Sequence, residues 1–138
     1  MRYLRSGLAG VLLALGLGQM AWAQNFTTQT EVQPIIEMTR SNWIAIGTQT
    51  GRDLLYFSHL LGWRCGVSVF RYGLNGATPD IVLQMEPCHR DSNQPNAIRE
   101  LPFVAHDLNS IDSVSVEVVF PDGQVLREDF TRAAILLD

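Results

Sequence analysis

The segment CGVSVFRYGLNG, which begins at Cys65, decides the fold that the sequence predicts. Its side chains alternate along an extended strand, so that Cys65, Val67 and Val69 share one face and Phe70 and Tyr72 share the other. The Asn-Gly pair at its end is typical of a hairpin turn, because both residues tolerate a positive φ. We therefore predict a strand and a turn, with the cysteine and valine face in the core.

Two further segments predict antiparallel hairpins. Residues 43–46 (WIAI) precede the turn-forming segment GTQTGR. Residues 114–120 (VSVEVVF) alternate largely between apolar and polar side chains, PDGQ turns the chain, and residues 125–130 return. Shorter strands are expected in three other places, at residues 80–85, after Pro102 and at residues 133–137.

Two segments fit both a helix and a strand. Residues 31–40 fit a short helix with Pro34 in its first turn, or an edge strand in which Pro34 removes no ladder hydrogen bond, and we favour the helix. Residues 53–61 fit a helix with Asp53 as its N-cap. However, the run LLYF is apolar on all sides and partly aromatic, which favours a strand buried on both faces.

About seven short strands with turns between them predict a mostly β chain. The fold class that we expect is a small antiparallel two-layer β-sandwich with one short helix at most, and the immunoglobulin-like arrangement is one option. The isolated Gly66 indicates a bulge or a close backbone approach.

The first 23 residues have the pattern of a cleaved signal peptide. Arg2 and Arg5 precede an uncharged apolar run at residues 7–17, and the segment AWA then offers a cleavage site before Gln24. The run is short for a membrane span. We expect one domain at residues 24–138, a periplasmic or secreted location, and no stable membrane span after cleavage.

The charge of the chain argues against nucleic acid as a partner. All ten basic residues are arginine, and loss of the leader leaves eight of them against fourteen acidic residues, a formal charge of −6. Such a surface offers no electrostatic footprint for nucleic acid or anionic lipid.

The two cysteines predict a structural disulfide. Cys65 and Cys88 are the only pair, and in an oxidising compartment such a pair usually forms a bridge. Closing this loop contributes roughly 3 kcal/mol in the chain-entropy model. Neither cysteine lies in a C-x-x-C motif, which argues against redox catalysis.

Aromatic residues with arginine are the composition of binding hot spots. If the face opposite the cysteine is exposed, it forms a partner surface together with the polar loop that follows Cys88; the alternative is that another element covers it. The candidate residues for this surface are Trp63, Phe70, Tyr72, Arg71, His89 and Arg90.

The function that we expect is a non-catalytic interaction or accessory module, with another envelope protein as its partner and no cofactor. The alternative is a small-ligand or metal-binding protein, for which Met85, Glu86 and His89 are weak candidate ligands. We assign no catalytic residue. A hydrolase would need His59 or His106 beside a serine and a carboxylate in a cleft.

Overall fold

The computed structural model describes residues 25–137. The predicted signal peptide lies outside the described residues. Within the described part of the chain, no helix has the length and apolar character needed to cross a membrane.

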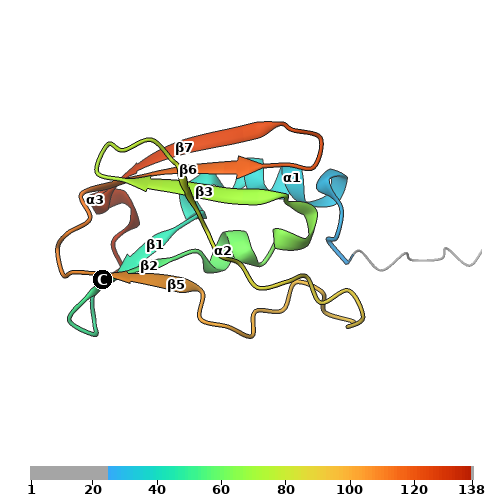
Figure 1. The fold of residues 1–138 in the computed structure, drawn as a ribbon, viewed down its shortest axis with the longest axis horizontal. Helices are drawn as coiled ribbons and strands as arrows, with labels where there is room; N and C mark the ends of the chain where they lie inside the picture. The colour runs from blue at the N-terminus through green and yellow to red at the C-terminus, as the bar shows by residue number, and fades with distance from the viewer. Residues whose placement is uncertain (1–24, 138) are drawn as a thin grey trace, which may run out of the picture.

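Seven strands in the described residues form two antiparallel sheets, which Figure 1 shows one above the other. The strand order is β1-β2-β5 in the first sheet and β4-β3-β6-β7 in the second. The strands are β1 (Ala45–Gly47), β2 (Asp53–Tyr56), β3 (Val69–Leu74), β4 (Ile81–Val82), β5 (Phe103–His106), β6 (Ser113–Val119) and β7 (Val125–Thr131).

The expectation of one short helix at most is wrong. The α-helices are α1 (Gln29–Met38), α2 (Ser58–Leu61) and α3 (Arg132–Ile135), and short 3₁₀ turns occur at η1 (Arg40–Asn42) and η2 (Arg64–Gly66). The helix predicted at residues 31–40 is confirmed as α1. Thr28 caps α1 through a hydrogen bond from the Glu31 amide, and Glu31 reaches back to accept from the Phe26 amide. This reciprocal pattern resembles a capping box.

Both predicted hairpins are confirmed. Strand β1 pairs with β2, and β6 pairs with β7 along their full length. The turns are those that the sequence indicates: Asn75 and Gly76 after β3 have positive φ angles of 56° and 83°, and Gly123 between β6 and β7 has a φ of 90°. These elements depend on local patterns, which is why the sequence is sufficient to predict them.

The predicted core face of the segment after Cys65 is correct for Cys65 and Val67, which are buried, but wrong within strand β3. Strand β3 begins only at Val69, because η2 interrupts the extended backbone and resets the alternation. Phe70 and Tyr72 point into the core, with exposed fractions of 0% and 4%, whereas Val69 and Arg71 are only partly buried. The turn is fixed by Gly66, at which a Cβ atom would collide with Val32 and Thr28. The close approach predicted at Gly66 is thus confirmed.

Three other strand predictions need correction. Residues 53–61 divide into strand β2 and helix α2, so the two interpretations each describe half of the segment. Residues 133–137 form the end of α3 and a single bridge from Leu136 to Ile46 instead of a strand. The strand expected at residues 80–85 is reduced to β4.

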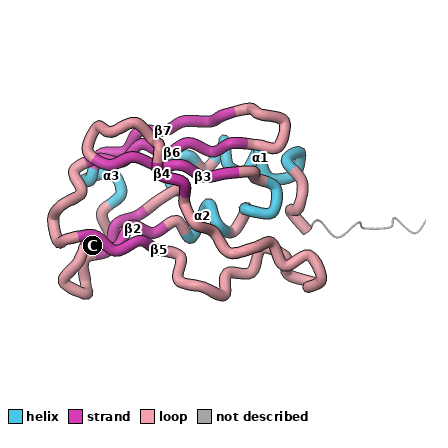
Figure 2. Tube along the Cα trace, viewed as in Figure 1, coloured by secondary structure: helices cyan, strands magenta, loops and turns pink. Residues whose placement is uncertain are grey.

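One hydrophobic cluster joins the two sheets and α1. It includes Leu55 from the first sheet, Phe70 and Val116 from the second, and Ile36 from α1, together with Trp43. Between β4 and β5 the chain runs without helix or strand, and Figure 2 shows this long segment as a loop at one end of the molecule.

Candidate functional site

A disulfide fastens the long loop between β4 and β5 to the body of the protein. The Sγ atoms of Cys65 and Cys88 are bonded at 2.12 Å, as the sequence predicts. Cys65 lies in η2, which begins three residues after the end of α2, and Cys88 lies in the loop. The bridge therefore joins the loop to η2, the turn that determines which side chains of β3 point into the core.

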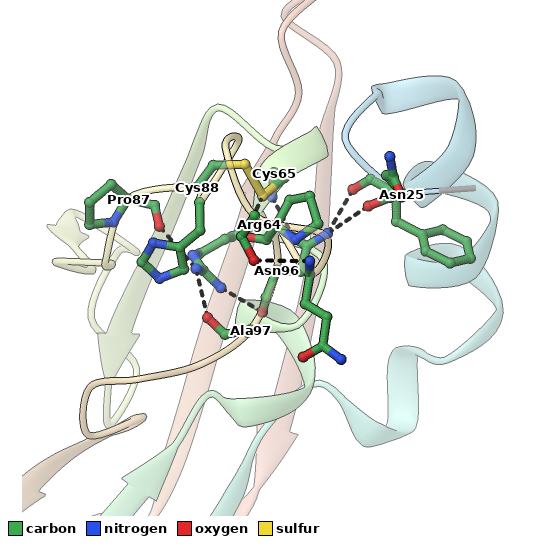
Figure 3. Close-up of a disulfide and its surroundings, with 12 residues drawn as sticks. Asn25, Arg64, Cys65, Pro87, Cys88, Asn96 and Ala97 are labelled. Carbon is green, nitrogen blue, oxygen red and sulfur yellow. Dashed lines mark hydrogen bonds between the residues drawn. A yellow bond between two sulfur atoms is a disulfide. The ribbon is translucent and has the colours of Figure 1, made fainter. Parts of the chain in front are cut away.

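Arg64, beside the disulfide, is the organising residue of this region (Figure 3). Its side chain is buried, with only 2% of the residue exposed. A guanidinium group has five N–H donors, and here main-chain carbonyl groups accept all five. The acceptors are Glu86 at 2.9 Å, Leu61 at 3.0 Å, Asn96 at 2.8 Å, Pro87 at 2.9 Å and Ala97 at 3.1 Å.

Glu86 provides a buried negative charge next to this guanidinium. Its Oε2 lies 3.6 Å from Arg64 Nη2 and 2.7 Å from His89 Nε2. Its Oε1 accepts hydrogen bonds from the amides of Arg99 and Glu100, at 2.7 and 3.1 Å. Burial alone raises the pKa of Glu86, but the two amides, His89 and the charge of Arg64 outweigh it and lower the pKa to about 2.

Asn96 connects the loop to the N-terminal segment. Its Oδ1 accepts from the Cys65 amide at 2.9 Å, and its Nδ2 donates to the carbonyls of Phe26 and Asn25 at 2.9 and 3.3 Å. Figure 3 shows this amide between the disulfide and the start of the described chain. Arg64 thus holds the loop near its start, at Glu86, and again at Ala97. Asn96 holds the loop to the N-terminal segment at Phe26.

We call Arg64, Glu86, His89 and Asn96 with the disulfide the Arg64 cluster. Because these hydrogen bonds are made within the protein, the cluster fixes the shape of the loop. We call the exposed side chains of the loop after Cys88 the loop face: Arg90, Asp91, Asn93, Gln94, Ile98, Arg99, Glu100 and Leu101. A hollow of about 270 Å³ adjoins it, lined by Asn25, Phe26, Gly62 and residues 93–97.

The partner surface predicted from the sequence is not assembled as expected. Phe70 and Tyr72 are core residues, so they cannot form part of it. Trp63 is partly buried against Phe26, with ring centroids 5.1 Å apart. Arg71 lies on another face, the outer side of the second sheet, and pairs with Glu117. The other two candidates, His89 and Arg90, lie on the loop, and of these Arg90 is exposed.

Two of the candidate metal ligands, Glu86 and His89, are hydrogen-bonded within the protein and are not arranged around a metal position. Glu86 and His89 are in contact, but the Glu86 oxygens already accept hydrogen bonds from the protein. No group of three or more histidine, cysteine or acidic side chains suited to a metal occurs in residues 25–137. The geometry therefore gives the metal hypothesis no support.

The two histidines considered for hydrolysis also have other surroundings. His59 Nε2 is hydrogen-bonded to Thr39 Oγ1 at 2.8 Å. His106 Nε2 is buried and has no hydrogen-bond partner in the described structure. Neither ring is bonded to a serine or a carboxylate there, so the arrangement that a hydrolase requires is not formed.

A second ion pair, between a buried carboxylate and a partly exposed arginine, lies at the opposite end of the sheets. Asp53 is fully buried and binds Arg132 in a bidentate manner at 2.6 and 2.9 Å. The amides of Asn109 and Ile111 donate to the same carboxylate at 3.0 and 3.1 Å. The hydrogen bonds from Arg132 are the main reason why the pKa of Asp53 is well below its usual range.

The roles of Arg64, Asp53 and Arg132 were not predicted from the sequence. The available signal for Arg64 was its place beside a cysteine predicted to be bridged, in an otherwise apolar segment. A charged residue in such a position needs a buried partner, and Glu86, two residues before the second cysteine, is the one the structure supplies.

The lowered pKa of Glu86 predicts acid sensitivity. Because its folded pKa of about 2 lies below the usual value of 4.5, ionised Glu86 favours the folded state fully above pH 4.5. This contribution is lost as the pH falls from about 4.5 to about 2. Urea unfolding of wild type and Glu86→Gln should therefore give a stability difference that shrinks over this window. A stability difference for Glu86→Gln that stays constant across this window would contradict the assignment.

Comparison of the chain with protein-family models, with curated proteins and with solved structures gives no match.

Proposed function

We propose that this chain is an exported, non-catalytic interaction module that uses its loop face to bind another protein of the cell envelope. The observation that carries this proposal is the use of all five Arg64 donors by main-chain carbonyls. An irregular segment of this length is ordinarily either functional or disordered. Here buried charges hold it in one shape.

The cost of this arrangement supports a role in binding. Burying an ion pair such as Arg64 with Glu86 adds little net stability compared with apolar residues of the same volume. What it provides here is a loop of defined conformation. A preordered loop loses less conformational entropy when a partner binds, so its affinity is higher.

The composition of the loop face fits a protein partner. Leu101 is 77% exposed and Ile98 is also exposed, so the face offers apolar contact area. Arg90, Arg99 and Glu100 supply charges of both signs. Apolar contacts within a polar rim are the usual anatomy of protein interfaces.

The location and fold follow from separate observations. The signal-peptide pattern and the disulfide both support a periplasmic or secreted protein with one domain at residues 24–138. The strand orders β1-β2-β5 and β4-β3-β6-β7 support an immunoglobulin-like sandwich. In a constant-type immunoglobulin domain, the first, second, fifth and fourth strands form one sheet and the other three strands form the second sheet. The present arrangement differs only in that the fourth strand pairs with the third.

Photocrosslinking tests the proposed surface. Benzoylphenylalanine at Leu101 in the full chain, expressed in its native cell, should give one specific protein adduct, identified by mass spectrometry. The matched control is the same probe at Met38, which is 84% exposed on α1. Ile98→Asp should reduce the adduct at least about tenfold, since it buries a charge in the interface, and should leave the melting temperature unchanged. Identical adducts from both positions, or no effect of Ile98→Asp, would place the binding surface elsewhere.

A further inference from the structure

A pocket of about 360 Å³ lies on the first sheet, and no residue of the loop face lines it. Strands β1 and β2, the turn between them, α2 and the end of the chain surround it. Its lining includes Ala45, Gly47, Leu54, Tyr56, His59 and Leu137. Its volume is near the lower end of the range for small-molecule sites, about 300–1,000 Å³.

The hollow results from small residues on β1 opposite large residues on β2. The cross-strand pairs are Ala45 with Tyr56 and Gly47 with Leu54. These four residues lie on the face of the sheet opposite the fully buried Ile46, because side chains alternate along a strand. A Cβ atom on Gly47 would lie 3.0 Å from the Tyr56 ring, so glycine is what allows this ring to approach β1.

The end of the described chain contributes to one side of the pocket. The Leu137 amide donates a hydrogen bond to the Ile46 carbonyl at 2.8 Å, which places Leu137 beside β1. The pocket thus has apolar walls from Ala45, Tyr56 and Leu137, none of which is buried. A ligand with an apolar body is the one that gains from such a surface.

The hydrogen bonds of His59 determine which of its ring nitrogens carries the proton. Thr39 Oγ1 donates its only hydrogen to the Ile35 carbonyl at 2.7 Å, so toward His59 it acts as an acceptor. His59 must therefore carry a proton on Nε2. Burial lowers the pKa of His59, which favours the neutral ring. Its remaining nitrogen, Nδ1, is then a hydrogen-bond acceptor, and His59 is one of the residues that line the pocket.

The polar groups of the wall carry no formal charge. Besides neutral His59 they are the amides of Asn42 and Gln49 and the hydroxyls of Thr50 and Ser58. A charged ligand group would lose its hydration in this pocket without an opposite charge to compensate, which is costly. A neutral ligand with a donor group would satisfy Nδ1.

We propose that this pocket binds an uncharged small molecule with an apolar body and one hydrogen-bond donor, of the phenol class, with His59 as the acceptor. This inference is independent of the proposed role of the loop face, because the two sites share no lining residue or exposed side chain.

Three probes of similar size test the proposal by NMR titration of the mature ¹⁵N-labelled protein. Phenol should shift the amide signals of Ala45, Gly47 and Tyr56. Anisole, which lacks the donor, should bind about 2- to 10-fold more weakly, the equivalent of one neutral hydrogen bond. Benzoate should cause no shift at these positions. Equal shifts from phenol and benzoate, or shifts confined to other regions, would overturn the proposal.

Variants then assign the roles of individual residues. Ala45→Leu should abolish the phenol shifts by filling the pocket, whereas the matched control Val82→Leu, on the exposed edge of the other sheet, should leave them unchanged. His59→Leu provides a test that does not depend on Ala45→Leu folding. The His59→Leu substitution should reduce the affinity for phenol to that for anisole, and it should leave the affinity for anisole unchanged. Persistence of the phenol preference in His59→Leu would overturn the role of His59.

Discussion

Replacing Arg64 with methionine should lower the free energy of unfolding by about 3–5 kcal/mol, the range found when one partner of a buried ion pair is removed. The variant leaves five main-chain carbonyls without their donor and Glu86 without its nearest positive side chain. Arg64→Lys should not restore stability, because an ammonium group has three donors and lacks the planar fork. Urea unfolding followed by tryptophan fluorescence measures the effect.

Arg71→Met is the matched control for this experiment. Arg71 also pairs with a glutamate, with Nη2 lying 3.3 Å from Glu117 Oε2, but both side chains are partly exposed to water. Exposed pairs contribute less than about 1 kcal/mol. If Arg64→Met were no more destabilising than Arg71→Met, the central position given to Arg64 would be wrong.

The second large effect is expected at Asp53. Asp53→Asn preserves the shape of the side chain but removes the charge that binds Arg132, and we expect a loss of about 3–5 kcal/mol. The carboxylate also accepts from the amides of Asn109 and Ile111, which positions the segment before β6. Thermal and urea unfolding of the purified variant give the measurement.

Asp129→Asn provides the comparison for Asp53→Asn. Asp129 faces Arg127 at 3.4 Å on the exposed side of β7. Loss of this contact should change stability by less than about 1 kcal/mol. Equal stability of the two variants would show that the Asp53–Arg132 pair is energetically replaceable.

The parts of the fold that the sequence predicts correctly are those determined by neighbouring residues. The hairpins β1–β2 and β6–β7 combine alternating side chains with turn residues of suitable backbone conformation. The correct helix at α1 likewise depends on local signals. In each of these cases, residues close together in the chain contain the necessary information.

The core face of β3 could not be predicted because its cause is not local. Alternation counted from Cys65 places Val69 inside, but η2 resets the phase before the strand begins. That turn depends on Gly66 packing against Thr28 and Val32, more than thirty residues earlier in the chain. The sequence indicated a close approach at Gly66, but it did not indicate what approached or how the strand would respond.

The candidate site was predicted only in part for a similar reason. The loop after Cys88 and its disulfide tether follow from composition and cysteine count, and both are present. Whether a charged residue is buried depends on partners distant in sequence: Asp53 and Arg132 are 79 residues apart, and Arg64 bonds the loop 22 to 33 residues away. Apart from the place of Arg64 beside a cysteine predicted to be bridged, the sequence contains no local signal for these pairs.

Amide hydrogen exchange in the loop is the most direct test of whether the Arg64 cluster holds it rigid. In the wild type, the amides of Arg99 and Glu100, which donate to Glu86, should exchange about as slowly as that of Val116 in the centre of the second sheet. In Arg64→Met, the two loop amides should exchange much faster than Val116, whose protection should fall only by the loss of global stability. Exchange of Arg99 and Glu100 in the wild type at the rate of an unstructured peptide would contradict a preformed loop.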